Sequence, residues 1–179
     1  MIKLKNNHQK NICLVNRSIY PHPISNHSQN MKTFEGWMRF WDKIVVISQS
    51  RLKKIKSSKH KSVYGVLLPK NSNKYLNILL FSINGFIEIY RLNKKYNFEV
   101  YQASDPGGAL LALVMSKLYK KKFIMEIQGD IFNYPSQIGA KFHATLVKFF
   151  SRFFAKKADF IRIVSPFLFQ SLEKLNIER

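Results

Sequence analysis

The sequence has few acidic residues, a single cysteine and none of the glycine-rich loops that bind nucleotides. It contains 10 Asp and Glu against 30 Lys and Arg, which gives a formal net charge of +20 at pH 7. With Cys13 alone, no disulfide framework can form within the chain, and a buried, inert thiol is expected. Neither a G-x-G-x-x-G run nor a P-loop lysine motif is present, so no nucleotide cofactor is expected.

Metal-binding patterns and membrane spans are missing as well. The five histidines show no metal-ligand spacing, so no metal site is expected. The longest apolar stretch, residues 75–90, includes Asn77, Asn84 and Glu88 and is too short and too polar for a bilayer span. No charged and then apolar leader is seen at the start. These features predict a cytoplasmic protein, with peripheral binding to the inner face of the cell membrane as a further expectation.

The excess of positive charge implies an anionic partner. Nucleic acid, an anionic membrane surface and a phosphorylated substrate would each satisfy it, and charge alone does not distinguish them. The sequence shows no recognition helix, no RNP-type aromatic signature and no zinc ligands, so only its charge supports nucleic acid. Of these partners, the membrane surface is therefore expected and nucleic acid is not.

Hydrophobic residues make up 46% of the 179 residues, enough for one globular domain with its own core. Residues 1–10 are predicted to be a basic lead-in, and residues 11–179 a single domain. Strands are predicted at 11–16, 43–47, 63–68, 100–103, 123–127 and 160–164. Helices are predicted at 29–41, 74–96, 107–119, 138–157 and 167–175, with a loop at 17–30 and a basic connector at 48–62. This alternation predicts an α/β fold with a doubly wound, mostly parallel sheet and helices on both faces.

The strand, helix and strand of residues 98–130 form the centre of this pattern. Asp105 is placed to cap the helix that follows, and Pro106 suits its first position. The helix is apolar nearly all round, which predicts burial against the sheet. Residues 104–108 and 128–130 follow the two strands, at the carboxyl edge where parallel sheets bind ligands.

Two groups at that edge are candidate binding residues. The backbone N–H groups of Gly107 and Gly108 could hold an anionic group, although tight packing of helix on sheet explains the glycines better. Gln128, Gly129 and Asp130 could bind the hydroxyls of a sugar or another polyol through amide and carboxylate groups. A plain turn is the alternative there, and the position on the ligand edge favours binding.

The helix expected near residues 138–157 has two faces. Phe142, Leu146, Phe149 and Phe153 share one stripe, which is expected to be core, and Phe150 and Phe154 widen the apolar arc. A basic amphipathic helix of this kind can also lie on an anionic membrane surface. The residues expected to meet such a surface are Lys141, Lys148, Arg152, Lys156 and Lys157.

Four segments resemble the N-terminal domain of GT-B glycosyltransferases of the large retaining family four. They are NICLVNRSIYPHP, FEVYQASDPGGALLA, FIMEIQGD and KKADFIRIVSPFLFQSLEKL, in this order. Together they cover most of residues 11–177. The last one is similar to the family's pattern of a cation, Ala-Asp, a strand, a serine and a helix.

The resemblance implies one Rossmann-like half of a GT-B enzyme, in which this half binds the acceptor and a second half binds the nucleotide sugar. The acceptor would be lipid-linked or a polysaccharide, and the chain would be incomplete alone, needing a second domain or subunit for the donor. Many members carry a histidine where this chain has Gln128, so no catalytic residue is assigned. The acceptor-binding residues implied are Arg17, Tyr20, Asp105, Gly107, Gly108, Gln128, Gly129 and Asp130. Two alternatives stay open: a basic nucleic-acid-binding protein, and a non-catalytic partner subunit of a split transferase.

Overall fold

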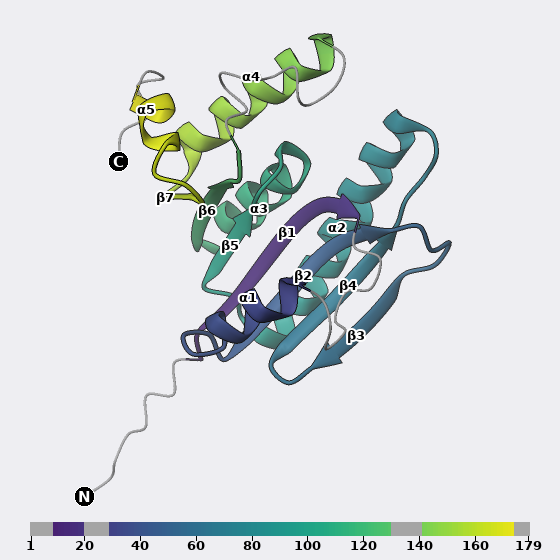
Figure 1. Cartoon of the computed structure of the whole chain (residues 1–179). Coiled ribbons are helices and arrows are strands. Elements are labelled where there is room, and N and C mark those ends of the chain that lie inside the picture. The colour runs from purple at the N-terminus through teal and green to yellow at the C-terminus, as the bar shows by residue number, and fades with distance from the viewer. Residues whose placement is uncertain (1–8, 20–28, 130–140, 174–179) are drawn as a thin grey trace, which may run out of the picture.

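A computed structural model describes residues 9–19, 29–129 and 141–173, which form a seven-stranded sheet flanked by helices (Figure 1). The strands are β1 (Asn11–Ile19), β2 (Lys43–Ser50), β3 (Lys56–His60), β4 (Val63–Pro69), β5 (Val100–Ala103), β6 (Lys122–Ile127) and β7 (Phe160–Ile163). The helices are α1 (Gln29–Trp37), α2 (Lys74–Tyr96), α3 (Pro106–Tyr119), α4 (Lys141–Lys157) and α5 (Leu168–Glu173).

The sheet is doubly wound, as the sequence predicts. Its strand order is β3-β4-β2-β1-β5-β6-β7, and every neighbouring pair is parallel except β3 with β4. The chain winds outward from β1 through β2 and β4, then returns through α2 to β5 on the other side of β1. The strand order therefore reverses between β1 and β5, and such a reversal opens a crevice at the carboxyl ends of the strands.

Helices cover the two faces of the sheet unequally. On one face, α1 places Phe34 on a cluster that includes Ile12, Ile44 and Val46. We call this side the α1 face; in Figure 1, α1 lies in front of β1 and β2, and α2 and α3 lie behind the sheet. The opposite face holds the larger core cluster, to which α2, α3, α4 and α5 all contribute. Cys13 is fully buried there, and burial raises the pKa of its thiol, so the inert thiol predicted from the sequence is confirmed.

The long helix α2 continues through a glycine that the sequence marks as a weak point. A Cβ at Gly85 would lie 2.6 Å from Cδ1 of Leu111 on α3. Gly85 is buried and lets α3 approach α2 closely, so its role is packing between the two helices.

One strand was not predicted. The basic connector expected at 48–62 contains β3, which pairs antiparallel with β4 at the edge of the sheet. Its turn into β4 uses Lys61 with φ 49°, a left-handed conformation for which the sequence offers no Gly or Asn signal. Lys56 and Lys59 are exposed on this edge strand, where charged side chains discourage pairing with other chains.

Three boundaries within the described residues differ from the prediction by three or four residues, and one of them is the end of β2, which lies at Ser50 and not at residue 47. β1 runs to Ile19 with a register shift after Val15, so Arg17 lies in a strand and not in the expected loop. α1 ends at Trp37, four residues before the predicted end, and the chain turns at Met38.

Burial on the helices is less complete than the sequence suggests. Leu110, Val114 and Leu118 of α3 are exposed, so only the inner half of this helix is buried. On α4, the predicted core stripe is wrong for Phe149 and Phe153, which are 63% and 45% exposed. Leu146 is also exposed, whereas Phe154, expected only to widen the arc, is buried in the core.

Candidate functional site

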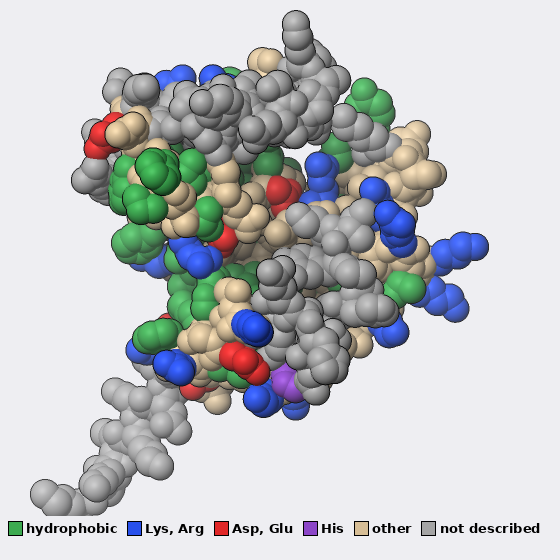
Figure 2. All heavy atoms as spheres, in the orientation of Figure 1, with side chains coloured by type: hydrophobic (Ala, Val, Ile, Leu, Met, Phe, Trp, Pro, Cys, Tyr) green, Lys and Arg blue, Asp and Glu red, His purple; other side chains and the backbone are tan. Residues whose placement is uncertain are grey.

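A cavity of about 260 Å³ opens on the α1 face at the carboxyl ends of the strands. Its walls come from β1, β5, β6, β7 and α1, so it lies at the reversal of strand order between β1 and β5. Figure 2 shows this side of the molecule, where the surface is hollowed between the part that carries α1 and the part that carries α5. The fold thus provides a pocket at the edge where the sequence predicts ligand binding.

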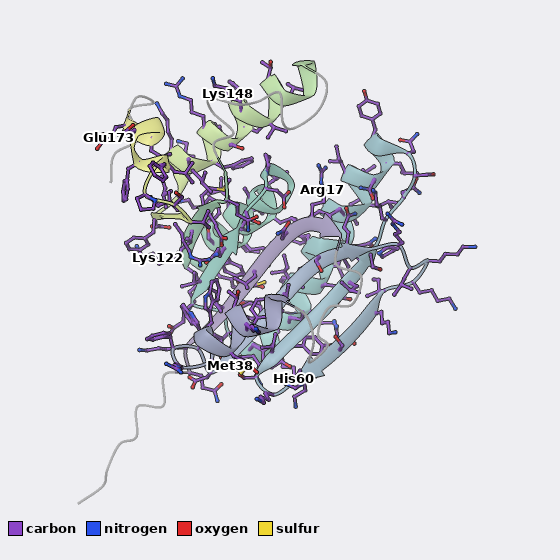
Figure 3. All side chains as sticks on the ribbon, viewed as in Figure 1. Arg17, Met38, His60, Lys122, Lys148 and Glu173 are labelled. Carbon is purple, nitrogen blue, oxygen red and sulfur yellow. The ribbon has the colours of Figure 1, made fainter. Side chains whose placement is uncertain are left out.

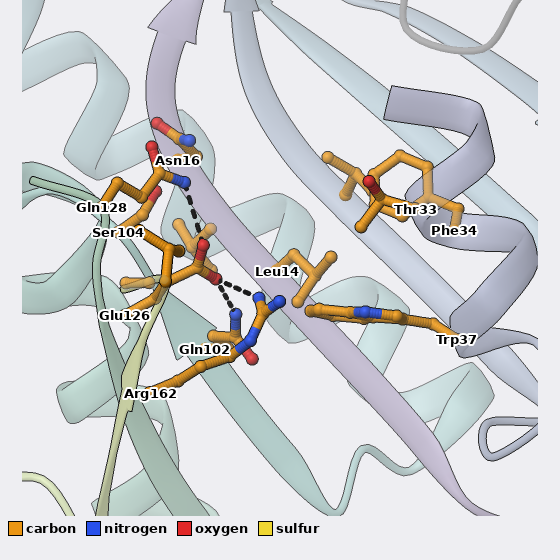
Figure 4. A pocket seen from close by; sticks show the side chains of 14 residues that line it. Leu14, Asn16, Thr33, Phe34, Trp37, Gln102, Ser104, Glu126, Gln128 and Arg162 are labelled. Carbon is orange, nitrogen blue, oxygen red and sulfur yellow. Dashed lines mark hydrogen bonds and ion pairs between the residues drawn. The ribbon is translucent and has the colours of Figure 1, made fainter. Parts of the chain in front are cut away.

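The carboxylate of Glu126 is the centre of the polar wall of this pocket (Figure 4). Oε2 accepts a 2.7 Å hydrogen bond from Nη1 of Arg162 and another from Nε2 of Gln102. Oε1 accepts a 3.0 Å hydrogen bond from Nε2 of Gln128. Three donors from three segments therefore fix the orientation of one carboxylate.

The register of the strands brings these side chains together. Glu126 on β6 lies directly opposite Arg162 on β7. Gln102 on β5 pairs with Ile124, two residues before Glu126, and alternation along a strand places positions two apart on the same face. The three polar residues thus share the α1 face and lie on β5, β6 and β7, next to the strands that α1 covers.

Glu126 is 8% exposed, so its charge needs partners. Arg162 supplies the opposite charge and the two amides supply neutral donors, so both oxygens of the carboxylate are hydrogen-bonded. The network leaves the wall with no unpaired charge.

The opposite wall is aromatic and comes from α1. The guanidinium carbon of Arg162 lies 4.8 Å from the ring centroid of Trp37, and Trp37 meets Phe34 edge to face with centroids 6.5 Å apart. Leu14 of β1 lies between the two walls in Figure 4. A half-buried indole therefore faces a set of amide and carboxylate groups across the pocket.

Beside the pocket, Asp105 joins β1 to the start of α3. Its Oδ1 accepts hydrogen bonds from the N–H groups of Gly107 and Gly108 at 2.9 and 3.1 Å, and its Oδ2 accepts one from the N–H of Arg17 at 2.6 Å. Pro106 occupies the first helical position. The predicted cap is confirmed, and the two glycine N–H groups proposed for an anion are bonded to this carboxylate.

The two glycines also explain how closely α3 approaches β1. A Cβ at Gly108 would lie 2.3 Å from the backbone oxygen of Val15, closer than atoms can pack. At Gly107 it would lie 3.2 Å from Cδ of Arg17, which is tight. These distances support the packing explanation.

The residues predicted to bind an acceptor fall into three groups. Gln128 lines the pocket, and a Cβ added at Gly129, the next residue, would meet no described atom within 4 Å. Arg17, Asp105, Gly107 and Gly108 adjoin the pocket residues Asn16 and Ser104, and Figure 3 shows Arg17 at the end of β1. Tyr20 and Asp130 lie outside the described residues. The acceptor-binding role of all eight stays a prediction.

Sequence reasoning missed four residues of the pocket: Trp37, Gln102, Glu126 and Arg162. The missed signal is one polar residue inside each of three short apolar strands: Gln in VYQA, Glu in KFIMEI, which also begins with Lys122, and Arg in FIRI. In the order β5-β6-β7 these residues become neighbours, but only pairing tells which of them share a face. Trp37 lies in the helix predicted at 29–41, where the sequence indicates no site.

The cations predicted for a membrane surface lie along α4. Arg152, Lys156 and Lys157 are exposed, and Lys148 is half-buried (Figure 3). Lys141 begins the helix, and its side chain lies outside the described part. Their binding to a membrane stays a prediction. Within the described residues, no helix is long and apolar enough to cross a bilayer, and no cluster of three metal-ligating side chains occurs.

No family model and no curated protein matches this sequence. Among solved structures, one of sucrose-phosphate synthase from Thermosynechococcus elongatus superposes with a TM-score of 0.66 at 10% identity, covering 93% of this chain and 45% of that one. The fold is glycosyltransferase-like. A second structure with that name gives a TM-score of 0.57 at 10% identity, over 95% of this chain and 84% of that one.

This glycosyltransferase-like fold is what the similarity shows, because identity of 10% carries no information on substrates. The chain spans less than half the length of the first of these two structures. The fold predicted from the sequence and the fold of these solved structures therefore agree: both are Rossmann-like α/β, as in GT-B proteins.

Proposed function

We propose that this chain supplies the acceptor-binding part of a glycosyltransferase, and that the pocket around Glu126 holds a hydroxyl-rich acceptor. One observation carries the proposal: a glycosyltransferase-like fold places an oriented carboxylate opposite an indole at its ligand edge. The acceptor is a lipid-linked or polysaccharide sugar, and the donor is a nucleotide sugar held by a second domain or subunit.

The two walls suit the two sides of a sugar. Hydroxyl groups both donate and accept, so they can bind to the carboxylate of Glu126 and to the amides of Gln102 and Gln128. The C–H face of a pyranose is apolar and can pack on the exposed part of the half-buried indole of Trp37, beside the guanidinium of Arg162. Seven of the 14 lining residues are polar, so this pocket offers more hydrogen-bonding groups than a typical small-molecule site, as a hydroxyl-rich ligand requires.

The same pocket is poorly suited to a nucleotide diphosphate. Among the residues that line it, Arg162 is the one cation, and it is bonded to Glu126. A diphosphate would meet the carboxylate without a free cation or a glycine-rich loop to offset its charge. The proposal therefore assigns neutral sugar to this pocket and the charged donor to another site.

Saccharide binding tests the proposal. The wild-type chain is screened on an array of neutral oligosaccharides, and the ligands found are titrated by calorimetry against wild type, Trp37→Ala and Glu126→Gln. We expect both variants to bind at least about tenfold more weakly, since each removes one wall's contact. Trp41→Ala, which removes a tryptophan that does not line the pocket, is the matched control and should bind as wild type does.

Three results would contradict the proposal: no saccharide binding, equal binding by the pocket variants, or tighter binding of UDP-, GDP- or ADP-sugars in this pocket. Thermal melts of each variant separate loss of the site from loss of the fold. If the chain is instead a nucleic-acid-binding protein, it should bind no saccharide and should bind oligonucleotides. A non-catalytic partner subunit would bind the saccharide but give no transfer with any donor-binding partner.

A further inference from the structure

The outward sides of α2 and α3 carry large apolar side chains. On α2 these are Leu79, Ile83 and Ile87, and on α3 they are Leu110, Val114 and Leu118, all between 43% and 56% exposed. The spacing of four residues on each helix aligns them along one side, opposite the buried residues. We call these six residues the outer apolar surface. A soluble surface helix normally presents polar residues there.

The surface is continuous between the two helices. Leu111 of α3 contacts α2 beside Gly85, and the ring of Tyr90 on α2 lies 6.3 Å from the ring of Tyr119, the last residue of α3. Tyr90 also stacks with Phe86 one turn earlier, with centroids 6.3 Å apart. Both Phe86 and Tyr90 are more than a third exposed, so aromatic rings extend the outer apolar surface toward the ends of the helices.

Cations border this surface at the carboxyl ends of α2 and α3. Lys94 places its Nζ 4.5 Å from the ring centroid of Tyr90, and Lys117 is exposed one turn from Val114 on α3. Helix α3 contains no Asp or Glu, and the single acid of α2, Glu88, is paired with Arg91 at 2.6 Å. Asp159, which follows α4, is the acid that acts on Lys117, so cations outnumber acids on this border and its charge is positive.

We propose that the outer apolar surface docks onto an anionic lipid bilayer. Exposed apolar side chains with an aromatic and basic border match the side chains of helices that lie in a membrane interface. Pairing with a second copy is disfavoured because each chain carries a formal charge of +20 and would repel its like. Anionic headgroups supply the complementary charge.

This proposal does not rest on the sugar pocket, which lies on the opposite face of the sheet. The proposed membrane contact also differs from the one predicted from the sequence: the predicted contact uses cations of α4, whereas the outer apolar surface lies on α2 and α3. Helix α4 packs beside α3, and its exposed Phe149 and Phe153 would add to the same contact if they face the bilayer. The test therefore changes α2 and α3 first and leaves α4 intact.

The test is flotation of the full chain with phosphatidylglycerol–phosphatidylcholine vesicles, beside vesicles of phosphatidylcholine alone. Wild type should float with the anionic vesicles, and the triple change Leu79→Ser, Ile83→Ser, Leu118→Ser should weaken binding about tenfold or more. The matched control is Phe40→Ser, Leu52→Ser, Ile55→Ser, which removes three exposed apolar side chains from other elements and should bind as wild type does.

A second pair of variants tests the charge. Replacing Lys94, Lys117 and Lys121 by Gln should weaken binding by roughly a hundredfold, since each cation near the membrane contributes independently. Replacing Lys53, Lys54 and Lys59 by Gln gives the same net charge but changes the β3 edge and the segment before it, so it should weaken binding less than about threefold.

Several outcomes would overturn the proposal. The proposal is wrong if the wild-type chain does not float with anionic vesicles. It is also wrong if the test triple variant and the control triple variant weaken vesicle binding equally. Sedimentation that shows a dimer broken by the Leu79, Ile83, Leu118 triple would assign the surface to a second copy. Circular dichroism of each variant confirms that its fold is kept, and the single change Ile83→Ser serves where the triple does not fold.

Discussion

Arg162 bonds to Glu126 and also covers Trp37: its Nη1 lies 2.7 Å from Oε2 of the carboxylate, and its guanidinium carbon lies 4.8 Å from the indole centroid. One side chain thereby joins β7, β6 and α1 across the pocket. Planar guanidinium groups suit this double role because they bond at their edge and stack on their face.

Removal of Arg162 alone should destabilise the fold more than removal of the pair. Arg162→Leu leaves the buried Glu126 carboxylate without its cation, and we expect a loss of about 1–3 kcal/mol in the free energy of unfolding. The double variant Arg162→Leu, Glu126→Leu should recover most of that loss, since no charge remains unpaired. Urea denaturation measures both. Equal stability of the single and double variants would show that the ion pair has no energetic role.

Asp105 should be a stabilising residue through its cap. Asp105→Ala leaves three N–H donors of Arg17, Gly107 and Gly108 without their acceptor, so we expect a loss of about 1–2 kcal/mol. Asp105→Asn keeps an accepting oxygen and should lose less. The exposed Glu35, whose oxygen lies 3.9 Å from Lys61, gives the control: Glu35→Ala should change stability by less than about 0.5 kcal/mol. A lower melting temperature for Glu35→Ala than for Asp105→Ala would refute this assignment.

Gly108 should tolerate no side chain. The Cβ of Gly108→Ala would lie 2.3 Å from the oxygen of Val15, which is backbone and cannot move without shifting β1 or α3. We expect a loss of about 1–3 kcal/mol or more, as in other overpacked sites. Gly36→Ala is the contrast: its Cβ meets nothing within 4 Å on α1, so the better helix former should add about 0.5–1 kcal/mol. Chemical denaturation measures the free energy of unfolding of both variants. Equal changes in this free energy would contradict the explanation based on packing distances.

Asp159 should give stability that depends on pH. Burial alone would raise the pKa of this carboxyl group, but the N–H of Phe123 at 2.9 Å and the ammonium of Lys122 at 3.1 Å outweigh it and lower the pKa. A pKa lowered by folding stabilises the fold above the unfolded pKa of about 4, and this contribution is lost as the pH falls through the folded value. Asp159→Asn should therefore be less stable than wild type at pH 7.

The stability difference between wild type and Asp159→Asn should shrink as the pH falls below the unfolded pKa of about 4, because the carboxyl group is protonated first in the unfolded chain and then in the folded one. Glu35→Gln, which changes an exposed carboxylate on α1, is measured beside it as the reference variant. A difference that stays constant from pH 7 to pH 3 would mean that the charge of Asp159 does not act on the fold.

Local signals in the sequence predicted much of the fold. The cap of Asp105 and Pro106 located the start of α3, and the long apolar pattern gave α2 its observed bounds. These signals depend on neighbours in the chain, so they can be read without the structure. Strand β3 could not be predicted this way, because KSSKH has no apolar alternation and pairs only through the edge of β4.

The pocket lies at the predicted edge of the sheet, but of the predicted binding residues that the structure describes, only Gln128 lines it. Parallel strands put Gln128 at the ligand edge, whereas the network of Glu126 depends on which strands are neighbours. Gln102 and Arg162 are 60 residues apart in the chain, and they meet only because β6 lies between β5 and β7. Trp37 joins them because α1 packs on the same face. Such contacts are set by topology and do not appear in local sequence patterns.

Tryptophan fluorescence tests the sugar pocket most directly, because the chain has two tryptophans and only Trp37 lines it. In Trp41→Phe, emission comes from Trp37 alone, and titration with a neutral oligosaccharide selected on the array should shift or quench it with saturation. In Trp37→Phe, emission comes from Trp41, and the same titration should leave it unchanged. A saturable change from Trp41 with none from Trp37, or none from either, would contradict the account.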